Sequence, residues 1–333
     1  MGTKKHRENT LKALEKDPMT MGGVVIEHAS KEKYLGDIIS ELGCKQSIDE
    51  TIKERMRKLT SKGDEAIQIA DAPMMGCDGN SLTAIKLFEA QVIPALLFNC
   101  ESWIGITDCQ VDELQSFQNK FIRKLLHLPI STPKAILHWD AGMEMMKWRI
   151  AKRKMLFLRK LMLKYDSSIC KRAIINESLL GVKGLGHECK ELSTLVGLPD
   201  IRYNKVNKND IIKAIEKHSR ASVKSEVEAS KKVGDRANGE PEHNSYLSYM
   251  TLPNSRIWIR VRARSVKGVK VNNKRSFTNL SCRFCDSGAD ESQEHLEECG
   301  GCVFERRRVN MTSWKGRVIF WRRMTTKISA VRG

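Results

Sequence analysis

The sequence predicts a mainly α-helical protein with one small β-hairpin near its N-terminus. From residue 47 onward, apolar residues recur at intervals of three and four, the periodicity of amphipathic helices. Comparable strand patterns occur only at residues 23–28 and 33–40, which are short and rich in β-branched and aromatic side chains. The chain has 333 residues, of which 41% are hydrophobic, so it can build a sizeable core.

The two strand candidates predict a single antiparallel hairpin. Residues 23–28 read GVVIEH, residues 33–40 read KYLGDIIS, and the polar residues ASKE lie between them. A two-stranded hairpin is marginally stable in water. We therefore expect it to pack on helices or on a larger sheet.

The first two predicted helices follow the hairpin. Ser47 is the expected N-cap of the first, because Glu50 follows at the spacing of a capping box. The second, residues 81–103, is almost continuously apolar and is therefore expected inside a helical bundle. Pro94 is expected to kink this helix or to divide it in two.

Two further helices have clear limits. Thr107 is the expected cap of the third, which is expected to stop before Pro129. The fourth runs from about residue 142 to 165. Its expected buried face consists of Met146, Ile150, Phe157 and Leu161, and the basic residues Arg149, Lys152 and Arg159 lie roughly opposite. Helical patterns continue less regularly to residue 234, and residues 235–253 read as a polar linker.

The charge balance favours a polyanionic partner. Lys and Arg number 58 against 40 Asp and Glu, giving a net charge of +18. Nucleic acid is the commonest such partner, and an acidic membrane surface is the main competitor. No stretch approaches the roughly 20 apolar residues of a membrane-spanning helix, and the first residues lack the apolar core of a secretory signal. We expect an intracellular protein, nuclear or cytoplasmic.

Ten cysteines in a reducing compartment are expected to be thiols or metal ligands. Six of them are scattered singly and are expected to be ordinary buried thiols: Cys44, Cys77, Cys100, Cys109, Cys170 and Cys189. None has a histidine and an acid partner recognisable in the sequence, so a thiol enzyme is not indicated.

The other four cysteines lie in CRFCDSGADESQEHLEECGGC, residues 282–302. Cys282 and Cys285 form a C-x2-C pair, and His295 and Cys299 follow as H-x3-C. Two close pairs of such ligands predict the closed tetrahedral shell of a structural Zn2+ site, with Cys302 as a substitute for Cys299. Residues 286–294 contain no apolar side chain larger than alanine, so metal binding is expected to order them. The alternative is a solvent loop with reduced thiols.

Basic segments flank this stretch. A run of one sign favours contact with phosphates, although a solvated basic face is the alternative. Residues 256–275 contain eight basic residues, no acidic one and an interleaved tryptophan. The predicted nucleic-acid contacts are Arg256, Trp258, Arg260, Arg262, Arg264, Lys267, Lys270, Lys274 and Arg275 before the cysteines, and Arg306, Arg307 and Arg308 after them.

Several motifs together resemble a known family. They are KYLG in the hairpin, ESW at the end of the apolar helix, STP followed by AG, and the C-x2-C and H-x3-C pairs. In this order, from about Met21 to Val309, they resemble the region after the catalytic palm in reverse transcriptases of non-LTR (LINE-type) retrotransposons. That region comprises a helical thumb and a C-terminal CCHC zinc knuckle.

The resemblance implies a role for each part. The hairpin would brace the primer end, the helices from residue 47 to about 128 would hold the template-primer duplex, and the basic knuckle region would bind RNA or target DNA. The expected domains are a palm-end remnant with the hairpin at 1–46, a thumb-like helical domain at 47–130, a helical connector at 131–234, a linker at 235–253, and a zinc knuckle with flanking basic helices at 254–333.

The chain departs from this family where catalysis is concerned. Such a polymerase binds two Mg2+ ions through paired aspartates, and this chain contains no Asp-Asp pair. We therefore expect no Mg2+ site and a non-catalytic, nucleic-acid-binding fragment. One alternative is the tail of an intact RNA-directed DNA polymerase whose palm and endonuclease are missing from this chain and would be its partners. A second alternative is a helical zinc module that binds other proteins.

Overall fold

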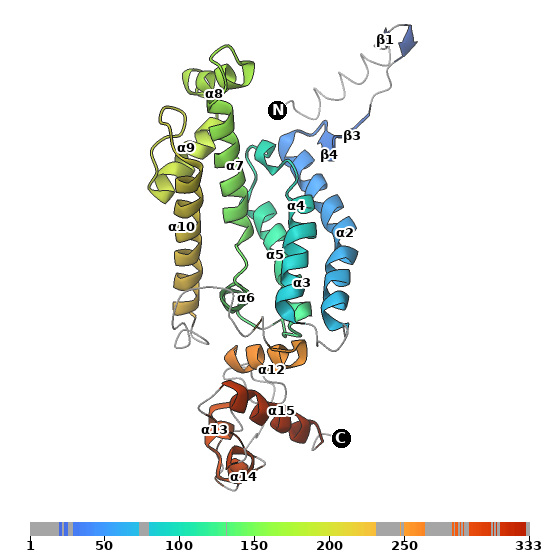
Figure 1. Ribbon diagram of the computed structural model, residues 1–333. Helices are drawn as coiled ribbons and strands as arrows, with labels where there is room; N and C mark the ends of the chain where they lie inside the picture. The colour runs from blue at the N-terminus through green and yellow to red at the C-terminus, as the bar shows by residue number, and fades with distance from the viewer. Residues whose placement is uncertain are drawn as a thin grey trace.

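The computed structural model confirms a mainly helical protein with a small antiparallel strand pair near the N-terminus. It describes residues 20–21, 23–25, 29–72, 80–130, 132–230, 247, 250–263, 282, 284–285, 287, 289, 293–307, 309, 311 and 314–330. The molecule is elongated, and α12 lies between the long helices and the C-terminal helices α13 to α15 (Figure 1).

The strands differ from the predicted ones. β3 (Lys31–Tyr34) pairs with β4 (Asp37–Ser40), so the segment expected to be one strand folds back on itself. Leu35 and Gly36 form the turn, with φ of 48° and 88°. Positive φ at both central residues is the geometry of a tight type I′ hairpin turn. A second short pair, β1 (Thr20–Met21) with β2 (Val24–Val25), precedes it.

Helix α2 (Cys44–Asp71) supports the β3–β4 hairpin. It begins three residues before Ser47, so the predicted cap is wrong. The Ser47 hydroxyl instead accepts a hydrogen bond from the Ser40 amide at 2.8 Å, and the Thr51 hydroxyl accepts one from the Ile38 amide at 2.8 Å. These two side chains satisfy β4 amides that a third strand would otherwise satisfy, so the hairpin packs on a helix as expected.

The apolar segment around Pro94 is not divided at the proline. It consists of α3 (Ser81–Leu87), a π-helical turn η1 (Phe88–Val92), α4 (Ile93–Leu96) and, after a short turn, η2 (Cys100–Ser102). The backbone stays helical through both junctions and leaves the helix at Leu97, and the π-helical turn directly before Pro94 accommodates a residue that lacks an N–H.

Helix α5 (Asp108–Leu125) begins as predicted. Thr107 accepts a hydrogen bond from the Gln110 amide, and the Gln110 side chain accepts one from the Thr107 amide, which completes a capping box. Two shorter connections lead to α6 (Lys134–Ala141) and α7 (Met146–Met162). The remaining described elements are α8 (Ile169–Leu179), α9 (Leu185–Val196), α10 (Lys208–Glu228), α12 (Leu252–Arg262), α13 (Gln293–Glu298), η4 (Gly300–Cys302), α14 (Val303–Arg307) and α15 (Trp314–Ala330).

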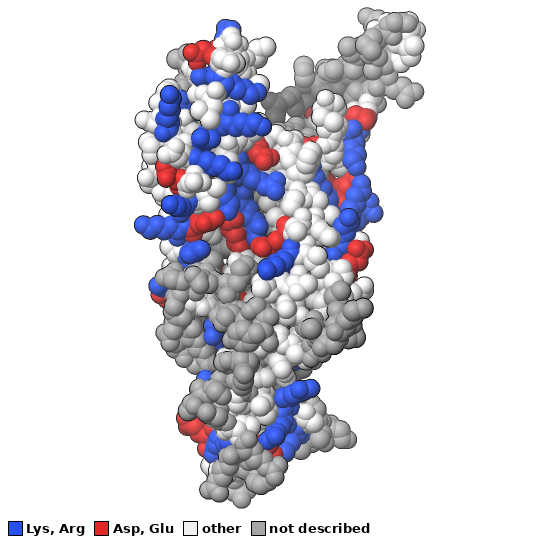
Figure 2. Space-filling model, viewed as in Figure 1, with Lys and Arg blue, Asp and Glu red and all other residues white. Residues whose placement is uncertain are grey.

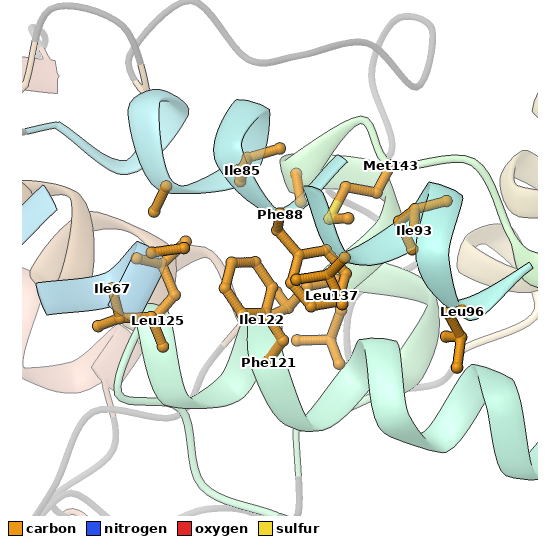
Figure 3. Close-up of a cluster of buried hydrophobic side chains, with 14 of the residues drawn as sticks. Ile67, Ile85, Phe88, Ile93, Leu96, Phe121, Ile122, Leu125, Leu137 and Met143 are labelled. Carbon is orange, nitrogen blue, oxygen red and sulfur yellow. The ribbon is translucent and has the colours of Figure 1, made fainter. Parts of the chain in front are cut away.

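Helix α7 contributes residues to two hydrophobic cores. Ile150 packs in the first core with α2 to α5, whereas Met155 packs in the second with α9 and α10. Three of the four residues predicted for its buried face are buried, but Phe157 is 37% exposed. In the first core the rings of Phe88 and Phe121 stack with centroids 3.9 Å apart (Figure 3).

One guanidinium group connects the hairpin to the bundle. Arg55 of α2 donates to the carbonyl oxygens of Phe98 at 2.5 Å and Gly36 at 3.0 Å, and to the Asp37 carboxylate at 2.6 Å. The Asn99 amide donates to the other oxygen of Asp37 at 2.6 Å. The hairpin turn, α2 and the segment after α4 are thus held by a single buried cation.

Replacing Arg55 with Met is expected to lower the free energy of unfolding by about 2–4 kcal/mol, because the Asp37 carboxylate and two carbonyl oxygens lose their donor. Chemical denaturation measures this loss. Lys53→Met is the matched control, since its pair with Asp49 is exposed and is expected to contribute no measurable stability. Equal losses in the two variants would contradict the role given to Arg55.

A buried histidine links α5, α6 and α7. His138 is 2% exposed, and its ring nitrogens lie 3.2 Å from the Met143 carbonyl oxygen and 2.9 Å from the Gln115 side-chain nitrogen. Nε2 also lies 2.8 Å from the Asn119 side-chain oxygen, which itself accepts a hydrogen bond from the Gln115 amide at 3.2 Å. A neutral ring that donates from Nδ1 to the Met143 carbonyl accepts at Nε2 from Gln115. Burial lowers the pKa of His138 to about 4.

Because His138 is buried as a neutral ring, we expect the free energy of unfolding to fall in acid. As pH falls from about 6.5 to 4, the unfolded chain takes up a proton at His138 that the folded chain does not, so stability is lost in that window. The loss amounts to roughly 2–4 kcal/mol. Denaturation of the wild type and His138→Gln at several pH values is expected to give a flatter profile for the variant. Parallel profiles would show that this residue does not cause the loss.

Candidate metal centre

Four side chains converge near the C-terminus into one cluster. The ligand atoms of Cys282, Cys285, His295 and Cys299 all lie within 4.8 Å of one another. The sulfurs of Cys282 and Cys299 are 3.6 Å apart, and the Cys285 sulfur is 3.3 Å from Nε2 of His295. Ideal zinc bond lengths imply edges of about 3.8 Å between sulfurs and about 3.5 Å between sulfur and nitrogen. The cluster therefore has the size of a four-coordinate metal shell.

Short backbone contacts position these ligands. His295 lies in α13, and the Cys299 amide donates to the His295 carbonyl oxygen at 2.6 Å, so the H-x3-C spacing places both ligands one helical turn apart. The Cys282 amide donates to the Ala289 carbonyl oxygen at 2.7 Å, which closes the loop after the C-x2-C pair. Cys299 is the cysteine within this cluster, and Cys302 lies outside it.

The thiols differ in their ionisation. Hydrogen bonds from the side chain and backbone of Ser287 lower the pKa of Cys285 to about 6. Burial raises the pKa of both Cys282 and Cys302 to about 12. Of these two, only Cys282 is in the cluster, and a metal ion would therefore displace its proton on binding.

The cluster is built into a third hydrophobic core. Cys282 and Cys299 are 5% and 2% exposed and pack with Leu296 and with Trp321 of α15. The Trp321 indole donates to the Glu297 carboxylate at 2.9 Å. This enclosure is typical of a structural metal site rather than of one that keeps an open position for a substrate.

One glycine in this core escaped the sequence interpretation. A methyl group at Gly301 would overlap the backbone carbonyl of Phe284, in the turn between the first two ligands, whereas one at Gly300 would meet open space. The paired glycines between Cys299 and Cys302 are the pattern that could have indicated a close backbone approach.

Replacing Gly301 with Ala is expected to displace the Phe284 turn and weaken metal binding about tenfold or more, as when a group supporting a metal shell is removed. Elemental analysis and competition with a chelator measure this loss. Gly300→Ala is the control and is expected to retain the metal. Wild-type affinity in the Gly301 variant would show that the turn can move without cost.

The arginines predicted for phosphate contact on α12 have partners within the protein. Arg256 donates to the Leu125 carbonyl oxygen at 2.8 Å, and Arg260 donates twice to that of His127, at 3.0 and 2.6 Å. These carbonyls lie at the C-terminal end of α5, where oxygens lack helical partners. Arg262 forms an ion pair at 2.8 Å with Asp140 of α6, which is fully buried.

The other predicted contact residues are placed as follows. Trp258 is partly buried between the first and third cores, and Arg306 donates to the Glu297 carbonyl oxygen at 2.8 Å. The side chain of Arg307 and the residues Arg264, Lys267, Lys270, Lys274, Arg275 and Arg308 lie outside the described part of the chain. Phosphate contact by these residues stays a prediction.

The scattered cysteines are only partly as expected. Cys100 and Cys189 are buried, and burial raises the pKa of each to about 12. Cys44, Cys109 and Cys170 are exposed, so the expectation of buried thiols is wrong for these three. Cys77 lies outside the described residues.

Comparisons with family models, curated proteins and solved structures gave no match for this chain. Among the described helices, none has the length and apolarity required to cross a membrane.

Proposed function

We propose that this chain binds nucleic acid through its basic C-terminal part and that a structural zinc ion holds this part in shape. The observation that carries the proposal is the closed four-ligand cluster, which is built into a hydrophobic core and lies between two basic segments. In the family that the sequence resembles, this corresponds to a non-catalytic C-terminal fragment of a non-LTR retrotransposon reverse transcriptase that holds template-primer and binds RNA or target DNA.

The chemistry of the ligands favours zinc. Three thiols and one imidazole are soft and borderline ligands, which suit Zn2+ and do not suit the oxygen-seeking Mg2+. With four protein ligands the tetrahedral shell is complete, so the ion would hold the fold together rather than activate a water molecule.

The distribution of charge favours a nucleic-acid partner. The chain carries a net charge of +18, and residues 264–275 contain five basic residues and no acidic one. The stretch between the metal ligands is by contrast acidic, with three carboxylates in residues 286–291 alone. Phosphate contacts would therefore fall on the segments beside the metal site rather than on the site itself.

The sharpest test uses lysines, because Arg256, Arg260 and Arg262 also stabilise the fold. Replacing Lys267, Lys270 and Lys274 with Gln is expected to weaken binding to RNA or DNA. The slope of log affinity against log salt should decrease by about 2–3, since each lost phosphate contact removes about 0.7–0.9. Fluorescence anisotropy over a range of salt concentrations measures both quantities.

The matched control is a triple Gln variant of Lys164, Lys183 and Lys190, which are exposed residues after α7, before α9 and on α9, outside the helices that would hold template-primer. It removes the same net charge from other surfaces. Equal slopes in the wild type and the Lys267 variant would refute the assignment. Failure of the wild type to bind RNA or DNA at moderate salt would favour the protein-binding zinc module.

A specific surface favours the alternative that the chain is the tail of an intact polymerase. The end of the molecule at the β3–β4 hairpin exposes apolar side chains: Tyr34, Leu35, Ile39 and Phe98 are 53–74% exposed. A groove of about 420 Å³ lies beside them. A preceding palm domain would bury this surface. A transcript that continues upstream in frame into an Asp-Asp motif would support this alternative, and a transcript that starts at Met1 with stop codons above it would exclude it.

A further inference from the structure

Three cations lie on one face of α10, far in sequence from the basic C-terminal segments. Lys213, Lys217 and Arg220 are all exposed and are separated by four and three residues. These intervals place them on the same side of a helix, over a length of about 10 Å. We call these three residues the α10 stripe.

The stripe faces away from the protein interior. Ile211, Ile215 and Ser219 form the buried side of this part of the helix and pack towards the second core. The residues of the stripe lie on roughly the opposite side of α10 from these buried residues, as the 3.6-residue helical repeat requires. The apolar face of α10 is therefore already occupied by the protein.

The stripe forms no direct ion pair within the part of the chain that the structure describes. No carboxylate there lies within ion-pair distance of Lys213, Lys217 or Arg220. The neighbouring acid, Glu216, lies 3.6 Å from Lys152 of α7. Figure 2 shows further Lys and Arg side chains gathered over the region of α7 to α10.

Like charges three and four residues apart on a helix repel each other. Asp210 and Glu216 lie three or four residues from members of the stripe and offset only part of this repulsion. A bound polyanion would convert this repulsion into attraction, because each cation could then meet a phosphate. Duplex DNA presents one phosphate charge per about 1.7 Å of its axis, so a length of about 10 Å offers more than three phosphates to the three cations.

We propose that the α10 stripe is a second contact surface for the phosphate backbone of nucleic acid. This inference rests on the proposed function and assigns it a site outside the C-terminal region. The stripe consists of cations alone, so its contacts would be independent of base sequence. An acidic membrane is a poorer partner, because a helix that binds a bilayer surface inserts an apolar face, and that of α10 is buried.

The test replaces Lys213, Lys217 and Arg220 with Gln and uses the Lys164, Lys183 and Lys190 variant as the control of equal net charge. Labelled DNA duplex and labelled single-stranded RNA are the probes, at several salt concentrations. We expect the stripe variant to bind at least about tenfold more weakly at low salt and to lose about 2–3 from the salt slope. The control is expected to behave as the wild type.

The stripe variant is expected to fold, because Gln has nearly the helix propensity of Lys and removes the repulsion. Its thermal midpoint should equal or exceed that of the wild type. Unchanged binding, or the same weakening in both triple variants, would overturn the inference. So would loss of binding to anionic lipid vesicles with full retention of nucleic-acid affinity.

The experiment separates this inference from the proposed function. If the wild type binds neither probe, the proposed function fails and the inference fails with it. If the wild type binds, and the variant of Lys267, Lys270 and Lys274 is weakened while the stripe variant is not, then the inference alone fails.

Discussion

The arrangement of the molecule depends on how α12 docks on the end of α5. Arg256 and Arg260 donate to carbonyl oxygens that α5 leaves without helical partners, and Arg262 pairs with the buried Asp140. On its other side α12 contributes Val261 to the core that contains the metal ligands. Without these guanidinium contacts, the buried carboxylate of Asp140 would lose the cation of Arg262, and the C-terminal helices would lose polar contacts that fix them against the bundle.

The candidate metal cluster concerns a different segment of the same region, the loop between its two ligand pairs. The chain between its two ligand pairs has almost no apolar residues, so burial cannot determine its shape. Instead the ligands themselves become core residues, with Cys282 and Cys299 packed against Trp321. Metal binding and side-chain packing would therefore be coupled in this small unit: a bound ion would fix the turns, and α15 covers them.

Structural features that depend on neighbouring residues could be predicted from the sequence. Features that depend on contacts with residues distant in the sequence could not. The cap at Thr107 follows from neighbours in the chain and is found, and Pro94 is preceded by a π-helical turn in place of the expected break. The metal cluster was likewise visible in the spacing of its ligands. The turn at Leu35 and Gly36 was missed, because the strand pattern of residues 33–40 conceals it. The partners of Arg256 lie 131 and 185 residues away in sequence, so no local pattern could show them.

Arginines and lysines have different places in this structure. Arg55, Arg256 and Arg260 use planar, multiply donating guanidinium groups to bind several fixed acceptors inside the protein. Two of the three cations on the outer face of α10 are lysines, which act as strongly hydrated point charges and suit phosphates whose positions vary. A surface of this kind holds a polyanion without reading its bases, and its affinity falls steeply with salt. The net positive charge therefore overstates the number of arginines available to a partner, and the exposed lysines would contribute more to the proposed binding surface.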